Sequence, residues 1–134
     1  MRLYAGPLEE FFREVKQNNI AKRLEEAFLN AFRYRPSPGE VDSWKGSLLT
    51  FCGCLEDAEL LDNGIILEMQ LPRTSCRLDA MVTGLGEGNE ANAVVVELKQ
   101  WQKCSPSDAE EMVSTWVGGS HRDVLHPSVQ AVTP

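Results

Sequence analysis

Apolar residues recur at three- and four-residue spacings through the first part of the chain. The positions that share this spacing are Leu8, Phe11, Phe12, Val15, Ile20, Leu24, Ala27, Phe28, Ala31 and Phe32. Glutamate, lysine and arginine fill most of the other positions, so the pattern predicts amphipathic helix from Leu8 to Tyr34. The polar run 17–19 is expected to divide this segment into two helices. Their aromatic stripe is predicted to lie in the core.

A third helix is expected to follow a Pro-Ser-Pro-Gly sequence that ends the second. Ser37 is the predicted N-cap, Pro38 takes the first helical position, and Glu40 follows three residues after the cap. The helix would continue through Trp44 to about Leu55. An Asp-Asn-Gly turn at 62–64 then separates it from segments of a different character.

Three strands are predicted next, over 65–71, 76–84 and 91–101, because these segments are rich in apolar and β-branched residues. A glycine-rich loop joins the second strand to the third and indicates a hairpin. The third strand contains the run Ala93-Val-Val-Val and is therefore expected to be central in the sheet. A short helix from Asp108 to about Val117 follows, and then a loop and the start of another helix.

Hairpin register predicts which side chains of these strands meet. Four-residue and glycine-centred turns place Glu68 opposite Asp79, and Asp79 opposite Glu97. The result is a row of three carboxylates across one face, with Arg77 alongside. Strand side chains alternate, so Lys99 lies on the same face as Glu97. Directly opposed residues lie ~4.5–5.5 Å apart at Cβ, so three acids at that spacing repel one another unless a cation lies among them.

Such a row suits hydrolysis of a phosphodiester. Carboxylate oxygens bind Mg²⁺ or Mn²⁺, which lowers the pKa of a water molecule and stabilises charge on the phosphate. Lys99 would orient that water or stabilise the charge of the transition state. The alternative is a salt-bridged sheet face in contact with solvent. The position of the charges after an apolar, central strand favours a site.

Composition narrows the class of protein. The chain has 134 residues, which fits one domain, and a net charge of -7, which argues against nucleic-acid binding through bulk charge alone. There is no apolar run of the ~20 residues that cross a membrane and no signal-peptide pattern, so a cytoplasmic location is expected.

The four cysteines lack zinc-site spacing and are predicted to be free, buried thiols. Three tryptophans are expected to pack in the core or at an interface, with stacking on bases as the alternative: Trp44, Trp101 and Trp116.

At Asp79 and Glu97-Leu98-Lys99 the chain resembles the PD-(D/E)xK, or restriction-endonuclease-like, nuclease superfamily. Within it, the chain is similar to the nuclease-like domain at the N-terminus of a domain-of-unknown-function family of DNA/RNA helicase-like proteins. The likeness covers almost the whole sequence. It includes segments 1–6, 36–38 with Glu40 and Trp44, 67–72, 96–101, 117–119 and 124–131.

The resemblance implies a mixed central sheet flanked by helices. It also implies that Asp79 and Glu97 are metal ligands and that Lys99 is the catalytic lysine. Gln130 resembles a glutamine that some of these nucleases carry on a helix after the core motif. Members of the superfamily often have a further acid from an upstream helix or strand. Register favours Glu68 for this third ligand, with two alternatives, Glu40 and Glu56.

The expected function is therefore a nuclease that uses Mg²⁺ or Mn²⁺ to cleave DNA, with RNA the less favoured substrate. The domain would span 1–134, with a helical part over 1–60 and a sheet part over 61–134. Relatives continue into a helix where this chain ends at Pro134, so C-terminal truncation is expected. The alternative is a catalytically inactive module that binds nucleic acid or a partner protein, such as a helicase.

Overall fold

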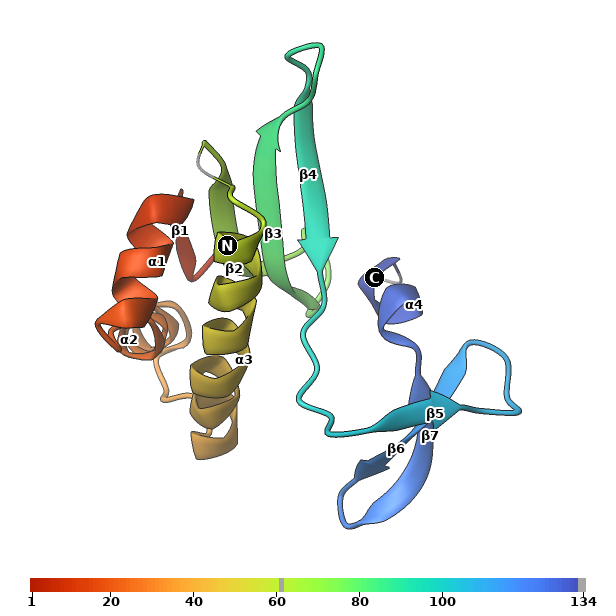
Figure 1. Ribbon diagram of the computed structural model, residues 1–134. Coiled ribbons are helices and arrows are strands. Elements are labelled where there is room, and N and C mark those ends of the chain that lie inside the picture. The colour runs from red at the N-terminus through yellow and green to blue at the C-terminus, as the bar shows by residue number, and fades with distance from the viewer. Residues whose placement is uncertain (61, 133–134) are drawn as a thin grey trace.

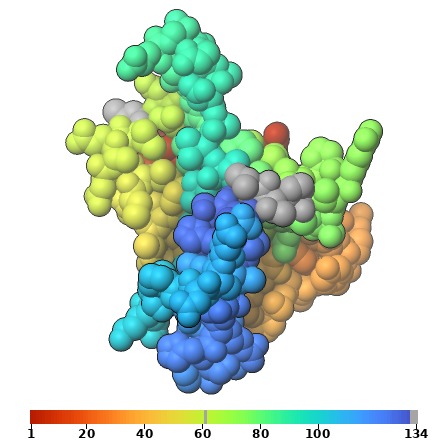
Figure 2. All heavy atoms as spheres, turned by 90° about the vertical axis from the view of Figure 1, so that its right-hand side faces the viewer, coloured from red at the N-terminus to blue at the C-terminus, as the bar shows by residue number. Residues whose placement is uncertain are grey.

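The computed structural model describes residues 1–60 and 62–132, which form an α+β structure. The first part contains β1 (Tyr4–Pro7), α1 (Leu8–Lys16), α2 (Ile20–Phe32), α3 (Pro38–Asp57), β2 (Gly64–Gln70), β3 (Arg77–Leu85) and β4 (Ala91–Val96). The second part contains β5 (Cys104–Pro106), β6 (Met112–Val117), β7 (Ser120–Leu125) and α4 (Pro127–Val132). The strands form two antiparallel sheets in the orders β1-β2-β3-β4 and β5-β6-β7 (Figure 1). Figure 2 shows the β3–β4 hairpin projecting from one end and the second sheet lying towards the other.

The predictions for the three helices of the first part of the chain are confirmed. The polar run 17–19 separates α1 from α2, and α3 begins at Pro38 after the N-cap Ser37. The Ser37 Oγ accepts a hydrogen bond of 3.1 Å from the backbone N–H of Glu40, which satisfies one of the free donors of the first turn. The apolar faces of the helices pack against the sheet, and Phe11 and Leu24 are completely buried there.

The offset of both predicted hairpins is also confirmed, although the predicted pairs Glu68–Asp79 and Asp79–Glu97 are not part of the strand ladder. Gln70 pairs with Arg77 across β2 and β3, and Ala80 pairs with Val96 across β3 and β4. The edge strand β1 was not predicted, because four residues are too few to show a period. It pairs with β2 from Tyr4 opposite Leu67, which brings the N-terminus onto the sheet.

The prediction for the third strand is wrong in two respects. The strand β4 ends at Val96 and not at 101, so Glu97 and Lys99 follow the strand. It is also an edge strand, not a central one, since β3 is its only neighbour among the described strands. The helical layer does not cover it. Val94 is 62% exposed, whereas Val82, which pairs with it on β3, is 9% exposed.

The predicted helix over 108–117 is wrong as well. The sequence of β6 alternates in burial, with Val113 and Thr115 buried and Trp116 exposed, which is the period of a strand. The strand β7 follows where a loop was expected, and α4 is confirmed. All strand pairs within the described residues are antiparallel, so the parallel pairing that a mixed sheet needs is not among them.

Two simpler predictions concern thiols and membranes. All four cysteines are free, as expected, but only Cys52 is buried; Cys54 on α3, Cys76 before β3 and Cys104 at the start of β5 are exposed. None of the described helices is long and apolar enough to pass through a bilayer.

Candidate active site

A cavity of about 330 Å³ lies between the helices and the end of the first sheet. Its apolar wall is formed by Leu24, Leu48, Leu67 and Leu98. Its polar wall comes from three elements: α3 contributes Glu40 and Trp44, β2 contributes Glu68, and β3 contributes Arg77 and Asp79. Glu68 and Asp79, the predicted acids of the two paired strands, therefore line the same cavity.

A break in strand β2 turns Glu68 into this cavity. Glu68 has a φ of 52°, in the left-handed region that side chains other than glycine rarely adopt. The ladder pairs Leu67 with Ala80 and omits Glu68 and Asp79, so the regular alternation of faces is interrupted. As a result, the neighbouring residues Leu67 and Glu68 both line the cavity. Backbone strain of this kind collects at functional sites.

The Glu68 carboxylate is held on both oxygens. The indole N–H of Trp44 donates a hydrogen bond of 3.0 Å to Oε1, and Arg77 Nη1 lies 3.2 Å from Oε2. Burial raises the pKa of Glu68 to about 7 and outweighs the lowering effects of Trp44 and Arg77. The charges of Asp79 and Glu40 raise this pKa further. Glu68 therefore titrates near neutral pH, beside the acids Glu40 and Asp79 of the same cavity wall.

Arg77 is the cation of this wall. Its Nη2 is hydrogen-bonded to Glu40 Oε1 in a short contact, and its guanidinium lies 5.6 Å from the ring centroid of Phe28. Its Nη1 is buried and makes no hydrogen bond, because its approach to Glu68 is an ion pair without hydrogen-bond geometry. Arg77 therefore keeps one buried donor atom without a hydrogen bond at the cavity wall.

Asp79 connects the strands to the segment after β4. Its Oδ2 accepts a hydrogen bond of 2.7 Å from the backbone N–H of Leu98. Burial raises the pKa of Asp79, and the backbone hydrogen bond opposes that rise. The charge of Glu97 raises the same pKa and the charge of Lys99 lowers it, which shows that both side chains lie near Asp79.

Glu97 and Lys99 pair with each other directly after the strand. Lys99 Nζ lies 2.8 Å from Glu97 Oε1, and the Glu97 side chain is only 9% exposed. Lys99 Nζ also lies 5.9 Å from the ring centroid of Trp101. The expectation that Glu97 and Lys99 share a side is consistent with this pair, although neither residue is in the strand.

The chemistry of this donor set fits Mg²⁺ or Mn²⁺, which prefer oxygen ligands. Asp79 and Glu97 are the two acids that lie together near Lys99. Within residues 1–60 and 62–132, no three histidine, cysteine or acidic side chains are placed to hold one ion. Glu68 faces Trp44 and Arg77, so its role as a third ligand stays a prediction. Mg²⁺ usually keeps several waters and is often bound through one or two carboxylates, so the roles of Asp79 and Glu97 as its ligands stay a prediction.

The remaining predicted residues are more distant. Glu40 lines the cavity and pairs with Arg77, whereas Glu56 is at the far end of α3 and pairs with Lys16 at 2.9 Å. Gln130 lies on α4 and is exposed. Among the described residues, no hydrogen bond links the Gln130 side chain to Asp79 or to the residues after β4, and Figure 1 shows α4 apart from the sheet.

Sequence reasoning placed Trp44 in the core and did not foresee its hydrogen bond to Glu68. A signal for it exists on α3, where Glu40, Trp44 and Ser47 recur at helical spacing and all line the cavity. Comparisons of the chain with protein-family models, with curated proteins and with solved structures find no match.

Proposed function

We propose that this chain is a metal-dependent nuclease of the restriction-endonuclease-like class, which hydrolyses phosphodiesters in DNA, with RNA the less favoured substrate. The observation that carries the proposal is the convergence of Asp79, Glu97 and Lys99 beside an acidic cavity. Asp79 comes from β3, and Glu97 and Lys99 come from the segment after β4. Lys99 pairs with Glu97, and a bound cation would offset the remaining repulsion between the two neighbouring carboxylates.

Each residue of the cluster has a role in this proposal. Asp79 and Glu97 would hold Mg²⁺ or Mn²⁺, and the bound ion would activate water and stabilise negative charge on the phosphate. The Leu98 N–H keeps the Asp79 carboxylate in position. Lys99 would donate to a phosphate oxygen as charge accumulates. Water would add to phosphorus and lose a proton to solvent, while the leaving sugar oxygen gains one.

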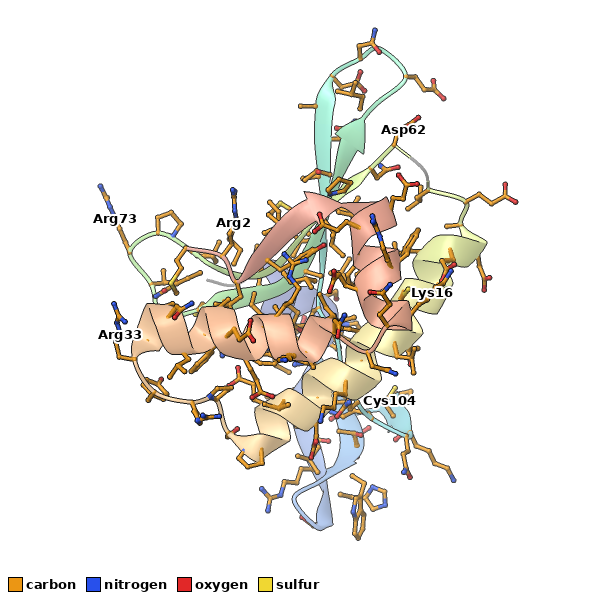
Figure 3. All side chains as sticks on the ribbon, turned by 90° about the vertical axis from the view of Figure 1, so that its left-hand side faces the viewer. Arg2, Lys16, Arg33, Asp62, Arg73 and Cys104 are labelled. Atoms are coloured by element: carbon orange, nitrogen blue, oxygen red, sulfur yellow. The ribbon has the colours of Figure 1, made fainter. Side chains whose placement is uncertain are left out.

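Cationic side chains support a nucleic-acid substrate despite the net charge of -7. Arg77 has a buried Nη1 without a hydrogen bond, and a phosphate oxygen would satisfy it. Arg2, Arg33 and Arg73 are exposed and project from the same side of the molecule in Figure 3. These side chains would contact the phosphate backbone through local charge.

The second candidate is a catalytically inactive relative that binds nucleic acid or a partner protein, such as a helicase. One observation favours it: the acids already have partners, since Glu68 pairs with Arg77 and Glu97 pairs with Lys99. Gln130, which would complete the expected set, is exposed on α4.

A nuclease assay separates the two candidates. Single- and double-stranded DNA and RNA are incubated with the chain in Mg²⁺, in Mn²⁺ and in EDTA. We expect cleavage that requires metal, and a loss of about 10²–10³-fold in Lys99→Ala because one charge-stabilising donor is removed. Lys103→Ala, which removes an exposed lysine four positions later, is the control and should cleave normally.

Metal binding is tested separately by calorimetry with Mn²⁺. Asp79→Asn should weaken binding strongly, because it replaces a charged oxygen ligand with a neutral one. Unchanged Mn²⁺ binding in Asp79→Asn, or cleavage that persists in EDTA, would contradict the proposed site.

A further inference from the structure

A second groove continues from the acidic cavity along α3. It has a volume of about 600 Å³ and shares two lining residues with the cavity, Ser47 and Leu98. Its far wall is the segment after β4, which includes Lys99 and Trp101. Figure 1 shows this segment passing beside α3 on its way to β5. The two spaces are therefore neighbouring parts of one surface, with Ser47 and Leu98 at their junction and Lys99 next to Leu98 on the groove side.

The lining of this groove, which we call the Trp101 groove, differs from that of the cavity. Phe51 and Trp101 contribute aromatic rings, and Thr50 and Gln100 contribute polar groups. Acidic side chains are absent from its described lining, whereas Glu40, Glu68 and Asp79 line the cavity. One space thus suits a cation with a phosphate, and the next suits a flat apolar ring with polar edges.

The groove wall is held in place by contacts between α3 and the segment after β4. Gln100 Nε2 donates a hydrogen bond of 3.2 Å to the backbone carbonyl of Ser43. Gly46 allows this approach, because a Cβ at that position would lie 2.5 Å from the same Nε2. Leu98 anchors the segment between these contacts by packing against the core. Trp101 is therefore presented by a tethered segment.

We propose that the Trp101 groove binds one unpaired nucleobase, and that the substrate is a single-stranded nucleic acid or a frayed end. The inference rests on the proposed function in taking a nucleic acid as the ligand. Base stacking on an aromatic side chain tolerates any base but needs a base whose face is free. In a duplex both faces are stacked on neighbouring pairs, so only an unpaired base can enter.

The position of Lys99 links the base to the phosphate. Its Nζ lies 5.9 Å from the Trp101 ring centroid and 2.8 Å from Glu97. One nucleotide is long enough to place its base on the ring and its phosphate at the ammonium. An aliphatic ligand would offer the ammonium no anionic group besides Glu97. A nucleotide would use both the aromatic ring of Trp101, through its base, and the ammonium of Lys99, through its phosphate.

The test measures binding without cleavage. Fluorescence anisotropy in EDTA is recorded with fluorescein-labelled (dT)8, with (rU)8, and with a blunt, fully complementary DNA duplex of the same length. We expect the single strands to bind more tightly than the duplex. Trp101→Ala should weaken single-strand binding by about tenfold and leave duplex binding unchanged, while Trp101→Phe should retain most of the affinity. A preference between (dT)8 and (rU)8 identifies which single strand is the better ligand.

The matched control is Trp116→Ala, which removes a tryptophan that is 59% exposed on β6. It should bind like the unmodified chain. Equal single-strand affinity in the unmodified chain and Trp101→Ala, preference for the duplex, or no binding of either single strand would overturn the proposal. Circular dichroism establishes that the variants are folded.

The two proposals can fail separately. Trp101-dependent binding by a chain that cleaves nothing would support the groove and contradict the nuclease. Metal-dependent cleavage with unchanged affinity in Trp101→Ala would support the nuclease and contradict the groove.

Discussion

The two sheets of this protein differ in how much they bury. The first sheet and its three helices share one apolar cluster that runs from Leu3 to Val82. In the second sheet only Val113 and Thr115 are buried among the described residues. The residues of the candidate site are divided between these two parts. Glu68 and Asp79 belong to the well-packed part, and Gln130 belongs to the sparsely packed part. Lys99 lies in the segment that joins them.

The difference in packing between the two sheets indicates which functional side chains have a fixed position. Side chains on a packed sheet keep their geometry, because moving them disturbs close-packed neighbours. The second sheet has a different kind of support: the hydroxyl of the buried Thr115 donates a hydrogen bond of 2.6 Å to the Lys103 carbonyl. Regions with few buried apolar contacts open locally at low cost. We therefore expect the Asp79 end of the site to be rigid and the Gln130 end to be mobile.

The largest effect is expected from a cavity in the first sheet. Leu67 is completely buried, so Leu67→Ala should lower the free energy of unfolding by about 3–5 kcal/mol. Leu49→Ala makes the same change on α3 at a side chain that is 62% exposed, and should cost less than about 1 kcal/mol. Urea unfolding followed by circular dichroism measures both. Equal losses would contradict the assignment of the core.

The next effect is a dependence of stability on pH. The pKa of Glu68 is raised to about 7, so between its ordinary value and pH 7 the folded state binds more protons than the unfolded state. The free energy of unfolding should therefore be highest below about pH 4.5 as far as Glu68 is concerned, and should fall as pH rises through 7. The expected loss is on the order of 3 kcal/mol.

Unfolding by urea at several pH values checks this sign. Glu68→Gln should remove most of the fall between pH 5 and 7.5. Glu56→Gln is the matched control, because Lys16 lowers the pKa of Glu56 and its titration lies below that window. A stability that rises with pH in this window, or a fall that survives in Glu68→Gln, would be inconsistent with a buried acid.

A smaller effect is expected in the second sheet. Val113→Ala should lower the free energy of unfolding by about 1–2 kcal/mol, because it truncates one of the few buried side chains there. Hydrogen exchange followed by mass spectrometry should show faster exchange in β6 and β7 while β2 and β3 keep their protection. Uniform protection across both sheets would show that they unfold together.

The smallest effect concerns one pair within the first sheet. Val82 and Val94 are directly opposed on β3 and β4, yet only Val82 is buried. Val94→Thr should change the free energy of unfolding by less than about 0.5 kcal/mol, whereas Val82→Thr should cost more because it buries a hydroxyl. Thermal unfolding of the two variants compares them. A larger loss in Val94→Thr would mean that β4 is covered.

Several features of the fold were predictable because they depend on neighbours in the sequence. The break between α1 and α2, the Ser37 cap and the register of both hairpins follow from local rules of spacing, capping and turn length. The same register predicts that Asp79 and Glu97 lie close together. The segment 108–117 was predicted to be a helix because a short apolar run fits either the helical or the strand period. In the structure, buried and exposed residues alternate within β6, which is the strand period.

The sequence by itself thus determined the first three helices, the hairpin register and the proximity of Asp79 to the Glu97-Leu98-Lys99 segment. Only the tertiary structure decided that Glu68 adopts a positive φ and turns towards Trp44 on α3 and Arg77 on β3, since these contacts come from other elements. It also decided that β4 lies at an edge and ends at Val96. Exposure depends on which elements are packed nearby, and no local pattern records that.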